Sequence, residues 1–181
     1  TMDSMNRKNL VVSLAVPDDV PGMQDVFYYG WLATYPNKEY GITVDDIEDR
    51  YKDRHSEERL ARRREQIATM SDNKLTMVAK LDGKIVGVCR MIKHPDKNQL
   101  SAIYVLPDYH GHGIGTAMWE AIQQHFDATK STIVDVAVYN AKAIKFYEGL
   151  GFVDTGKRFS DPKFKMKSGA AIPEMEMIRP A

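Results

Sequence analysis

The spacing of apolar positions changes near residue 75, and it predicts mainly helices before that point and mainly strands after it. The β-branched run LVVSLAV (10–16) first predicts one strand. Apolar side chains then recur at the spacing of a single helical face, in a segment that ends before Pro36. The residues on this face are Met23, Val26, Phe27, Gly30 and Trp31.

Two charged segments follow, and each begins with a helix-start signal. Thr43 with Asp46 three positions later resembles a capping box, which predicts a helix through VDDIEDRYKDR (44–54). Ser56 is a candidate N-cap for a second helix through EERLARRREQI. Charges of both signs are interleaved in these segments, so a solvated helical surface with i,i+4 pairs is the favoured interpretation.

From residue 75 the apolar positions follow the alternation of β-strands. LTMVAKL (75–81) and KIVGVCRMI (84–92) flank Asp82-Gly83, a dipeptide typical of type I′ turns. Together they predict a β-hairpin. NQLSAIYV (98–105) follows a short turn and predicts a third antiparallel strand.

A glycine-rich loop then leads into a second helical region. Apolar side chains at helical spacing follow the loop, at Ile114, Ala117, Met118, Ala121 and Ile122. Beyond this helix the pattern predicts a central strand, a short helix with Asn140 as N-cap, and two closing strands. Their segments are TIVDVAV (132–138), NAKAIKFYEGLG (140–151), FVDTGKRF (152–159) and EMEMIRP (174–180).

Composition narrows the class of protein. With 181 residues the chain fits one domain, which we place at 10–181, after a flexible N-terminus at 1–9. The 25 basic and 25 acidic side chains leave no global surplus for a nucleic-acid partner, although the run Arg62–Arg64 keeps a local basic patch open. The single cysteine, Cys89, has no internal disulfide partner and is expected in the core of a protein in a reduced compartment.

Neither a membrane nor an export signal is indicated. No apolar run approaches the roughly 20 residues that a spanning helix needs. The first residues, TMDSMNRKNL, have no hydrophobic signal core. These observations predict a cytoplasmic protein without a membrane partner.

The loop YHGHGIGTAM (109–118) is the strongest candidate site. Glycines at 111, 113 and 115 allow a close backbone approach, and the helix start behind them presents free N–H groups. Together these features favour an anion such as phosphate, although a tight strand-to-helix connection is the alternative. A P-loop is excluded because no Gly-Lys-Ser/Thr follows, and a dinucleotide fold is disfavoured because three antiparallel strands come first.

Two segments resemble signatures of one known family. VLPDYHGHGIGTAM (105–118) resembles motif A of the GNAT superfamily of acetyl-CoA-dependent N-acetyltransferases. His110 stands where that motif has Arg or Gln, and Gly113 and Gly115 stand at its two small positions. VYNAKAIKFYEGLGF (138–152) resembles the second family signature. The resemblance covers residues 74–152 well. The helices before residue 74 resemble the family only in their pattern.

The resemblance implies a fold and a cofactor. The fold would be α/β (α+β), a single GNAT-type domain. It would have a twisted, mostly antiparallel mixed sheet, a central parallel strand pair that splays apart, and flanking helices. Acetyl-CoA would be the co-substrate, without a metal, and its pantetheine arm would lie between the splayed strands. The cofactor-binding residues would be Ile103, Tyr104, Val105, His110, Gly111, His112, Gly113, Ile114, Gly115, Thr116, Asn140, Ala143, Phe146 and Tyr147.

The resemblance also assigns a general acid. Tyr147 would protonate the leaving thiolate, against the alternative that it is a buried aromatic packing residue. Asn140 would contact the cofactor or cap its helix. The usual carboxylate base is missing, because the strand has Gln99 and Ser101 at the positions where a glutamate is common, and no base is assigned.

The histidines and aromatic residues extend the candidate site. His110 and His112 have no further ligands at metal spacing, and they are expected to assist phosphate binding when protonated. Cofactor affinity should then fall as the pH rises through about 6.5. Trp31 and Tyr35 are candidates for an amine pocket, although core packing is favoured for Trp31.

The function implied is transfer of an acetyl group from acetyl-CoA to a primary amine by direct attack in a ternary complex. The acceptor would be a small molecule, a polyamine or a protein amino group. A non-catalytic acyl-CoA sensor and a regulator that binds nucleic acid are the alternatives. A homodimer formed through the late strands is a further expectation.

Overall fold

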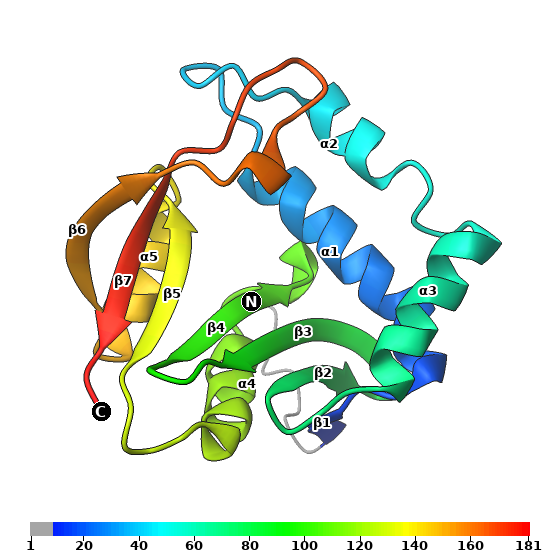
Figure 1. The fold of residues 1–181 in the computed structure, drawn as a ribbon. Coiled ribbons are helices and arrows are strands. Elements are labelled where there is room, and N and C mark those ends of the chain that lie inside the picture. Colours follow the sequence, from blue (N-terminus) through cyan, green and yellow to red (C-terminus); the bar gives the residue numbers. More distant parts are fainter. Residues whose placement is uncertain (1–8) are drawn as a thin grey trace, which may run out of the picture.

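In the computed structural model, which describes residues 9–181, seven strands form one sheet in the order β1-β2-β3-β4-β5-β7-β6 (Figure 1). The predicted flexible segment at 1–9 lies outside the described residues except for Asn9. The strands are β1 (Leu10–Leu14), β2 (Lys74–Leu81), β3 (Lys84–Lys93), β4 (Asn98–Val105), β5 (Thr132–Ala137), β6 (Val153–Phe159) and β7 (Glu174–Arg179). The helices are α1 (Val20–Thr34), α2 (Val44–Tyr51), α3 (Glu57–Ala68), α4 (Ile114–Ile122) and α5 (Ala141–Gly149).

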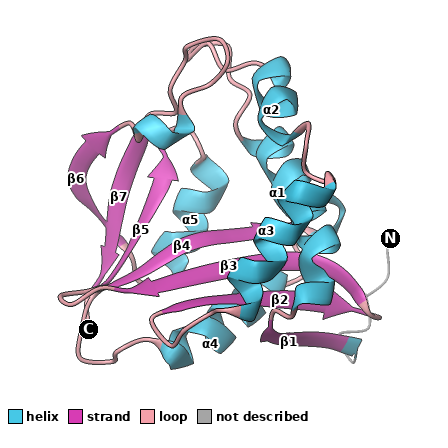
Figure 2. Ribbon diagram, turned by 45° about the vertical axis from the view of Figure 1, so that its right-hand side comes forward, coloured by secondary structure: helices cyan, strands magenta, loops and turns pink. Residues whose placement is uncertain are grey.

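Helices cover both faces of the sheet. Helices α1, α2 and α3 lie on one face, and α4 and α5 lie on the other (Figure 2). Successive side chains of a strand point to opposite faces, so Val78 and Val88 pack with α1 while Met77 and Cys89 pack with α4. The predicted core position of Cys89 is confirmed, and burial raises the pKa of its thiol to about 12.

The local signals in the sequence correspond to observed backbone geometry. Asp82 and Gly83 have φ angles of 50° and 81°, as the predicted type I′ turn requires. The predicted capping box is confirmed, because Thr43 Oγ1 accepts from Asp46 N at 3.1 Å and Asp46 Oδ2 accepts from Thr43 N at 2.9 Å. Helix α2 ends at Tyr51, earlier than predicted, because tight turns then bring Ser56 to cap α3.

The parallel pair β4–β5 splays apart, as expected. Only two positions pair, Asn98 with Thr132 and Gln99 with Ile133. Ser101 is an extra residue in β4, because Leu100 and Ala102 pair with adjacent residues of β3. Such a bulge bends its strand. Figure 1 shows β5 rising away from β4 beyond the point where they meet.

Candidate active site

A cavity of about 440 Å³ occupies the gap between the splayed strands. The lining comes from both faces of the sheet. The glycine loop and α5 supply one side, and the carboxyl end of α1 supplies the other, at Gly30, Thr34 and Tyr35. The cavity is therefore bounded by elements from both faces of the sheet.

The predicted site residues converge on this cavity, with two exceptions. The predicted residues that line it are Tyr35, Ile103, Tyr104, Val105, His110, Gly111, Gly113, Ile114, Gly115, Thr116, Asn140, Ala143, Phe146 and Tyr147. His112 is half-buried in the loop but is not part of the lining. Trp31 is only 6% exposed and belongs to a separate core cluster with Ile47 and Met166, so the structure supports its alternative role in packing.

The glycine loop ends in an open helix start. Gly111 and Gly113 have φ angles of 80° and 76°, in the left-handed region that glycine adopts without strain. The first hydrogen bond of α4 runs from Ala117 N to Gly113 O at 3.0 Å. The amides of residues 114–116 therefore point out of the helix end, toward the cavity that these residues line. This geometry suits an anion.

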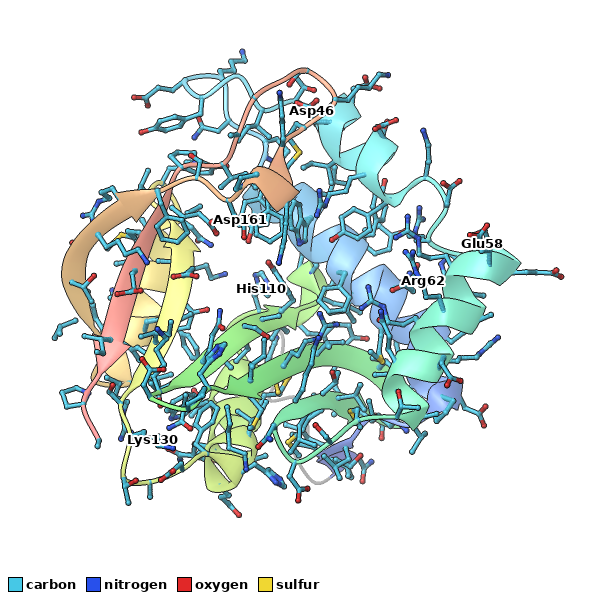
Figure 3. All side chains as sticks on the ribbon, viewed as in Figure 1. Asp46, Glu58, Arg62, His110, Lys130 and Asp161 are labelled. Atoms are coloured by element: carbon cyan, nitrogen blue, oxygen red, sulfur yellow. The ribbon has the colours of Figure 1, made fainter. Side chains whose placement is uncertain are left out.

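A lysine that the sequence analysis did not single out stands beside the loop. His110 lies beyond the carboxyl end of β4 (Figure 3), and its Nε2 is 2.8 Å from Val105 O. Because a carbonyl can only accept, Nε2 carries the proton and donates. The other nitrogen, Nδ1, lies 3.0 Å from Lys142 Nζ and therefore accepts from the ammonium group. Both ring nitrogens of His110 are therefore engaged within the protein, and Lys142 places its side-chain amine beside the loop.

The Val105 carbonyl and the Asn140 side chain already have partners within the protein. His110 donates to one lone pair of Val105 O, so the second lone pair and the Val105 N–H remain for the expected backbone contact. Asn140 Oδ1 accepts from Ala143 N at 3.1 Å and caps α5. Its amide hydrogens remain on the cavity wall. The capping alternative for Asn140 is thus observed, and it leaves a cofactor contact open.

Tyr147 reaches the cavity from a buried position. Its side chain is 6% exposed and packs between Phe146 and Phe152, with ring centroids 5.5 and 5.7 Å away. Burial raises the pKa of its phenol, so the hydroxyl keeps its proton at neutral pH. The geometry therefore offers a proton donor next to the space between the strands.

Tyrosines line the opposite side of the cavity. The hydroxyl groups of Tyr35 and Tyr104 are 2.7 Å apart, and Tyr139 donates to the backbone carbonyl of Tyr35 at 2.7 Å. Burial raises the pKa of Tyr104, which makes it a still weaker base than an ordinary phenol. The side chain of Tyr104 packs on Phe27 and Gly30 of α1, and its backbone pairs with Val88 of β3 on the side away from the gap.

Carboxylates on β5 and β7 face the same side as these tyrosines. Asp135 lines the cavity and is adjacent to Glu176 on the neighbouring strand. Burial, and then the charge of Glu176, raises the pKa of Asp135. Glu174 lies two positions along β7, and burial followed by the charges of Asp135 and Asp161 raises its pKa to about 7. The alternation in TIVDVA and EMEMIR places these acids on one sheet face, a signal that could have identified them.

Among residues 9–181, no three His, Cys, Asp or Glu side chains are grouped so that they could hold a metal ion. None of the helices in the same range combines the length and apolar character that crossing a membrane requires.

The fold and the cavity define a class of protein: a mixed sheet with a splayed parallel pair and an anion-binding helix start in the gap. The sequence matches the model of the acetyltransferase (GNAT) family over residues 41–152. The chain belongs to this family.

Curated relatives match over the central part of the chain. A protein of Bacillus subtilis named uncharacterized protein YrkN is 35% identical over 68 residues, which are 36% of this chain and 37% of that protein. An uncharacterized N-acetyltransferase of Mycobacterium tuberculosis is 33% identical over 85 residues, 45% of this chain and 54% of that protein. The match therefore spans only about a third to a half of the length of these relatives.

Solved structures extend the likeness to the whole fold. The PaiA N-acetyltransferase of Thermoplasma acidophilum, solved in complex with coenzyme A, superposes with a TM-score of 0.65. The superposition covers 95% of this chain and 99% of that one, at 19% sequence identity. At this identity the likeness establishes the fold.

Proposed function

We propose that the protein transfers an acetyl group from acetyl-CoA to a primary amine, by direct attack of the amine in a ternary complex. The observation that carries the proposal is the loss of β4–β5 pairing after Gln99, directly over a cavity that leads to the glycine loop. The gap leaves backbone groups of β4 without a strand partner on that side, as a peptide-like pantetheine arm would require.

The cofactor would extend from the gap to the start of α4. The pantetheine arm would lie along β4, and the pyrophosphate would accept from the amides of residues 111–116. Lys142 would add a positive charge at the position where the sequence predicted a protonated His110. The coenzyme A bound to the related Thermoplasma structure supports this choice of ligand.

The reaction requires three groups around the thioester. The neutral amine attacks the acetyl carbon, and a backbone N–H of β4 stabilises the oxyanion. As the new C–N bond forms, the amine proton passes to a carboxylate. The C–S bond then breaks, and Tyr147 donates its phenolic proton to the leaving thiolate. An amine that arrives protonated first loses one proton to solvent. After the reaction the carboxylate releases its proton to solvent and Tyr147 takes one up, so atoms and charges balance over one turnover.

We assign Asp135 as the proton acceptor. It lines the cavity from β5, whereas β4 has Gln99 and Ser101 in place of a carboxylate. Glu174 and Glu176 behind it make this wall negative, which would attract a protonated amine from the α1 side. Tyr35 would then contact the acceptor beside these acids. A cationic amine is therefore the favoured class of acceptor.

The first experiment is thiol release from acetyl-CoA with a panel of amines, run beside calorimetry with CoA. The panel contains spermidine and spermine, amino acids, aminoglycosides, and peptides with a free amino terminus or a lysine. Release with one class supports the transferase and identifies its acceptor. CoA binding without release by any amine would favour the sensor, and no CoA binding would contradict the proposal.

Asp135→Asn tests the assigned base. It should lower kcat by about 10²-fold or more at neutral pH and leave the Kd for CoA unchanged. Glu148→Gln, on the exposed side of α5, is the matched control and should keep wild-type turnover. Turnover that survives in Asp135→Asn would eliminate Asp135 as the base without affecting the transferase assignment.

A further inference from the structure

A second cavity, of about 310 Å³, lies among the three helices that cover the other face of the sheet from the glycine loop. Its lining combines four arginines with one glutamine and one tyrosine: Gln24, Arg50, Tyr51, Arg54, Arg59 and Arg63. These residues come from α1, α2, α3 and the turn that joins α2 to α3. None of them lines the cavity between β4 and β5. We call this second cavity the arginine pocket.

The positive charge in the arginine pocket is poorly compensated. Its lining contains no carboxylate. Arg54 Nε is 3.4 Å from Asp25 Oδ1, an oxygen that also lies 2.6 Å from His55 Nε2. Arg50 donates to the neutral carbonyl of Lys163 at 3.2 Å, and Arg63 donates to the side-chain amide of Gln66 at the same distance.

Aromatic rings contact three of the four guanidinium groups. Arg50 lies over Trp31 at 4.7 Å, Arg54 over Tyr28 at 3.9 Å and Arg63 over Phe27 at 5.8 Å. These contacts hold the planar groups by their faces and leave N–H groups at their edges free to donate. These three arginines would therefore lose little side-chain entropy on binding a ligand.

The buried side-chain amide of Gln24 belongs to the lining of the arginine pocket. Gln24 is only 3% exposed, and it donates to the backbone carbonyl of Arg54 at 3.1 Å. This bond uses one of its two amide hydrogens, and no partner of the second is observed among the described residues. Gln24 also fixes the turn that presents Arg54.

The arginines raise one another's electrostatic energy. Burial, and then the charges of Arg59 and Arg62, lowers the pKa of Arg63. Arg90 of β3 shares the Phe27 ring with Arg63, and burial and the charge of Arg63 lower the pKa of Arg90 to about 10. Such crowding destabilises the charged forms unless an anion lies between them.

We propose that the arginine pocket is a binding site for a small anion that carries phosphate or carboxylate groups. Guanidinium groups bind both of these through paired N–H donors, and the cavity volume is near the lower limit of small-molecule sites. A nucleic-acid strand fits less well, because Arg62 and Arg64 are exposed on α3 and do not line the pocket. The site is independent of the acetyl-transfer proposal.

The test measures binding of inorganic phosphate by calorimetry at constant ionic strength, with and without saturating CoA. Because phosphate would also bind the glycine loop, the relevant signal is the binding that CoA leaves in place. Arg59→Gln is the informative variant, since no hydrogen bond or ion pair of Arg59's side chain is observed among the described residues. Arg62→Gln removes the same charge from the exposed face of the same helix and is the matched control.

We expect one saturable phosphate site in the presence of CoA, weakened about tenfold or more by Arg59→Gln and unchanged by Arg62→Gln. Citrate, as a carboxylate probe, distinguishes the two anion types by its relative affinity. Absence of saturable binding, its complete loss on CoA addition, or equal weakening by both variants would overturn the proposal. Oligonucleotide binding reduced equally by both variants, without phosphate binding, would instead indicate a nucleic-acid surface.

Discussion

At the scale of single residues, Tyr147 is the group on which the chemistry of acetyl transfer depends most directly. Its ring is enclosed by Phe146 and Phe152, while its hydroxyl has no hydrogen-bond partner among the described residues and belongs to a cavity-lining side chain. Removing the oxygen therefore leaves the packing intact and takes away only the proposed proton donor. Replacing Tyr147 by phenylalanine therefore tests the role of the hydroxyl separately from the packing of the ring.

Tyr147→Phe should lower kcat by about 10²-fold while the Kd for CoA and the free energy of unfolding stay close to wild type. The thiolate would then leave without a proton donor. Thiol-release kinetics, CoA calorimetry and urea unfolding measure the three quantities. Unchanged turnover would remove the acid role, whereas a fall in CoA affinity alone would indicate a binding contact instead.

The raised pKa of Glu174 makes the stability of the folded protein depend on pH. Burial first, and then Asp135 and Asp161, raises the pKa of its carboxyl from 4.5 to about 7 in the folded protein. Between these two values the folded state binds more protons than the unfolded state. Stability therefore decreases as the pH rises through this window, and the whole penalty is present above it.

Glu174→Gln should raise the free energy of unfolding at pH 8 by about 1 kcal/mol, after allowance for solvent screening, and should have no effect near pH 4. The neutral amide mimics the protonated acid, and its oxygen can still accept from the Asp161 amide. Urea unfolding across this pH range gives the measurement. Equal stability of the two proteins at pH 8 would show that the carboxylate carries no penalty.

At the scale of elements, Asp46 joins the start of α2 to a distant loop. Besides its bond to Thr43 N, it accepts from Ser168 N and Ser168 Oγ, both at 2.8 Å. Asp46 is 2% exposed, so the N–H groups that it satisfies have little access to water. This side chain therefore anchors the loop before β7 to the helix layer.

Asp46→Ala should reduce the free energy of unfolding by about 2–3 kcal/mol, because buried donors on both segments lose their acceptor. Thr43→Ala removes only the local half of the capping box and should cost about 1 kcal/mol. Urea unfolding of both variants compares them. Equal losses would mean that the contact with Ser168 contributes nothing.

The same elements explain what the sequence could predict. The capping box of Thr43 and Asp46 and the turn at Asp82-Gly83 are encoded within four residues, so pattern alone identified them. The bond from Ser168 to Asp46 joins residues 122 positions apart and has no local signal. Lys142 was missed for a similar reason, since only the fold brings it to His110.

At the scale of the whole molecule, the site depends on a departure from regular pairing. Alternation predicted β4 and β5 correctly, but periodicity has no information on where two paired strands separate. The splay was expected from the family resemblance. The β-bulge at Ser101 lies two residues beyond Gln99, where the pairing with β5 ends. The arginine pocket was not predicted, because its four arginines were interpreted as a solvated helical surface.

The gap between β4 and β5 predicts which backbone amides bound coenzyme A would protect. Coenzyme A at 100 times its Kd should stabilise the protein by about 2.7 kcal/mol, since it binds only the folded state. The added amide protection in hydrogen exchange should concentrate in residues 100–105 of β4 and in the first turn of α4, where backbone groups would gain partners. Helix α3 lies on the opposite face and should exchange unchanged. Protection spread evenly over the chain, or absent from β4, would contradict binding in the gap.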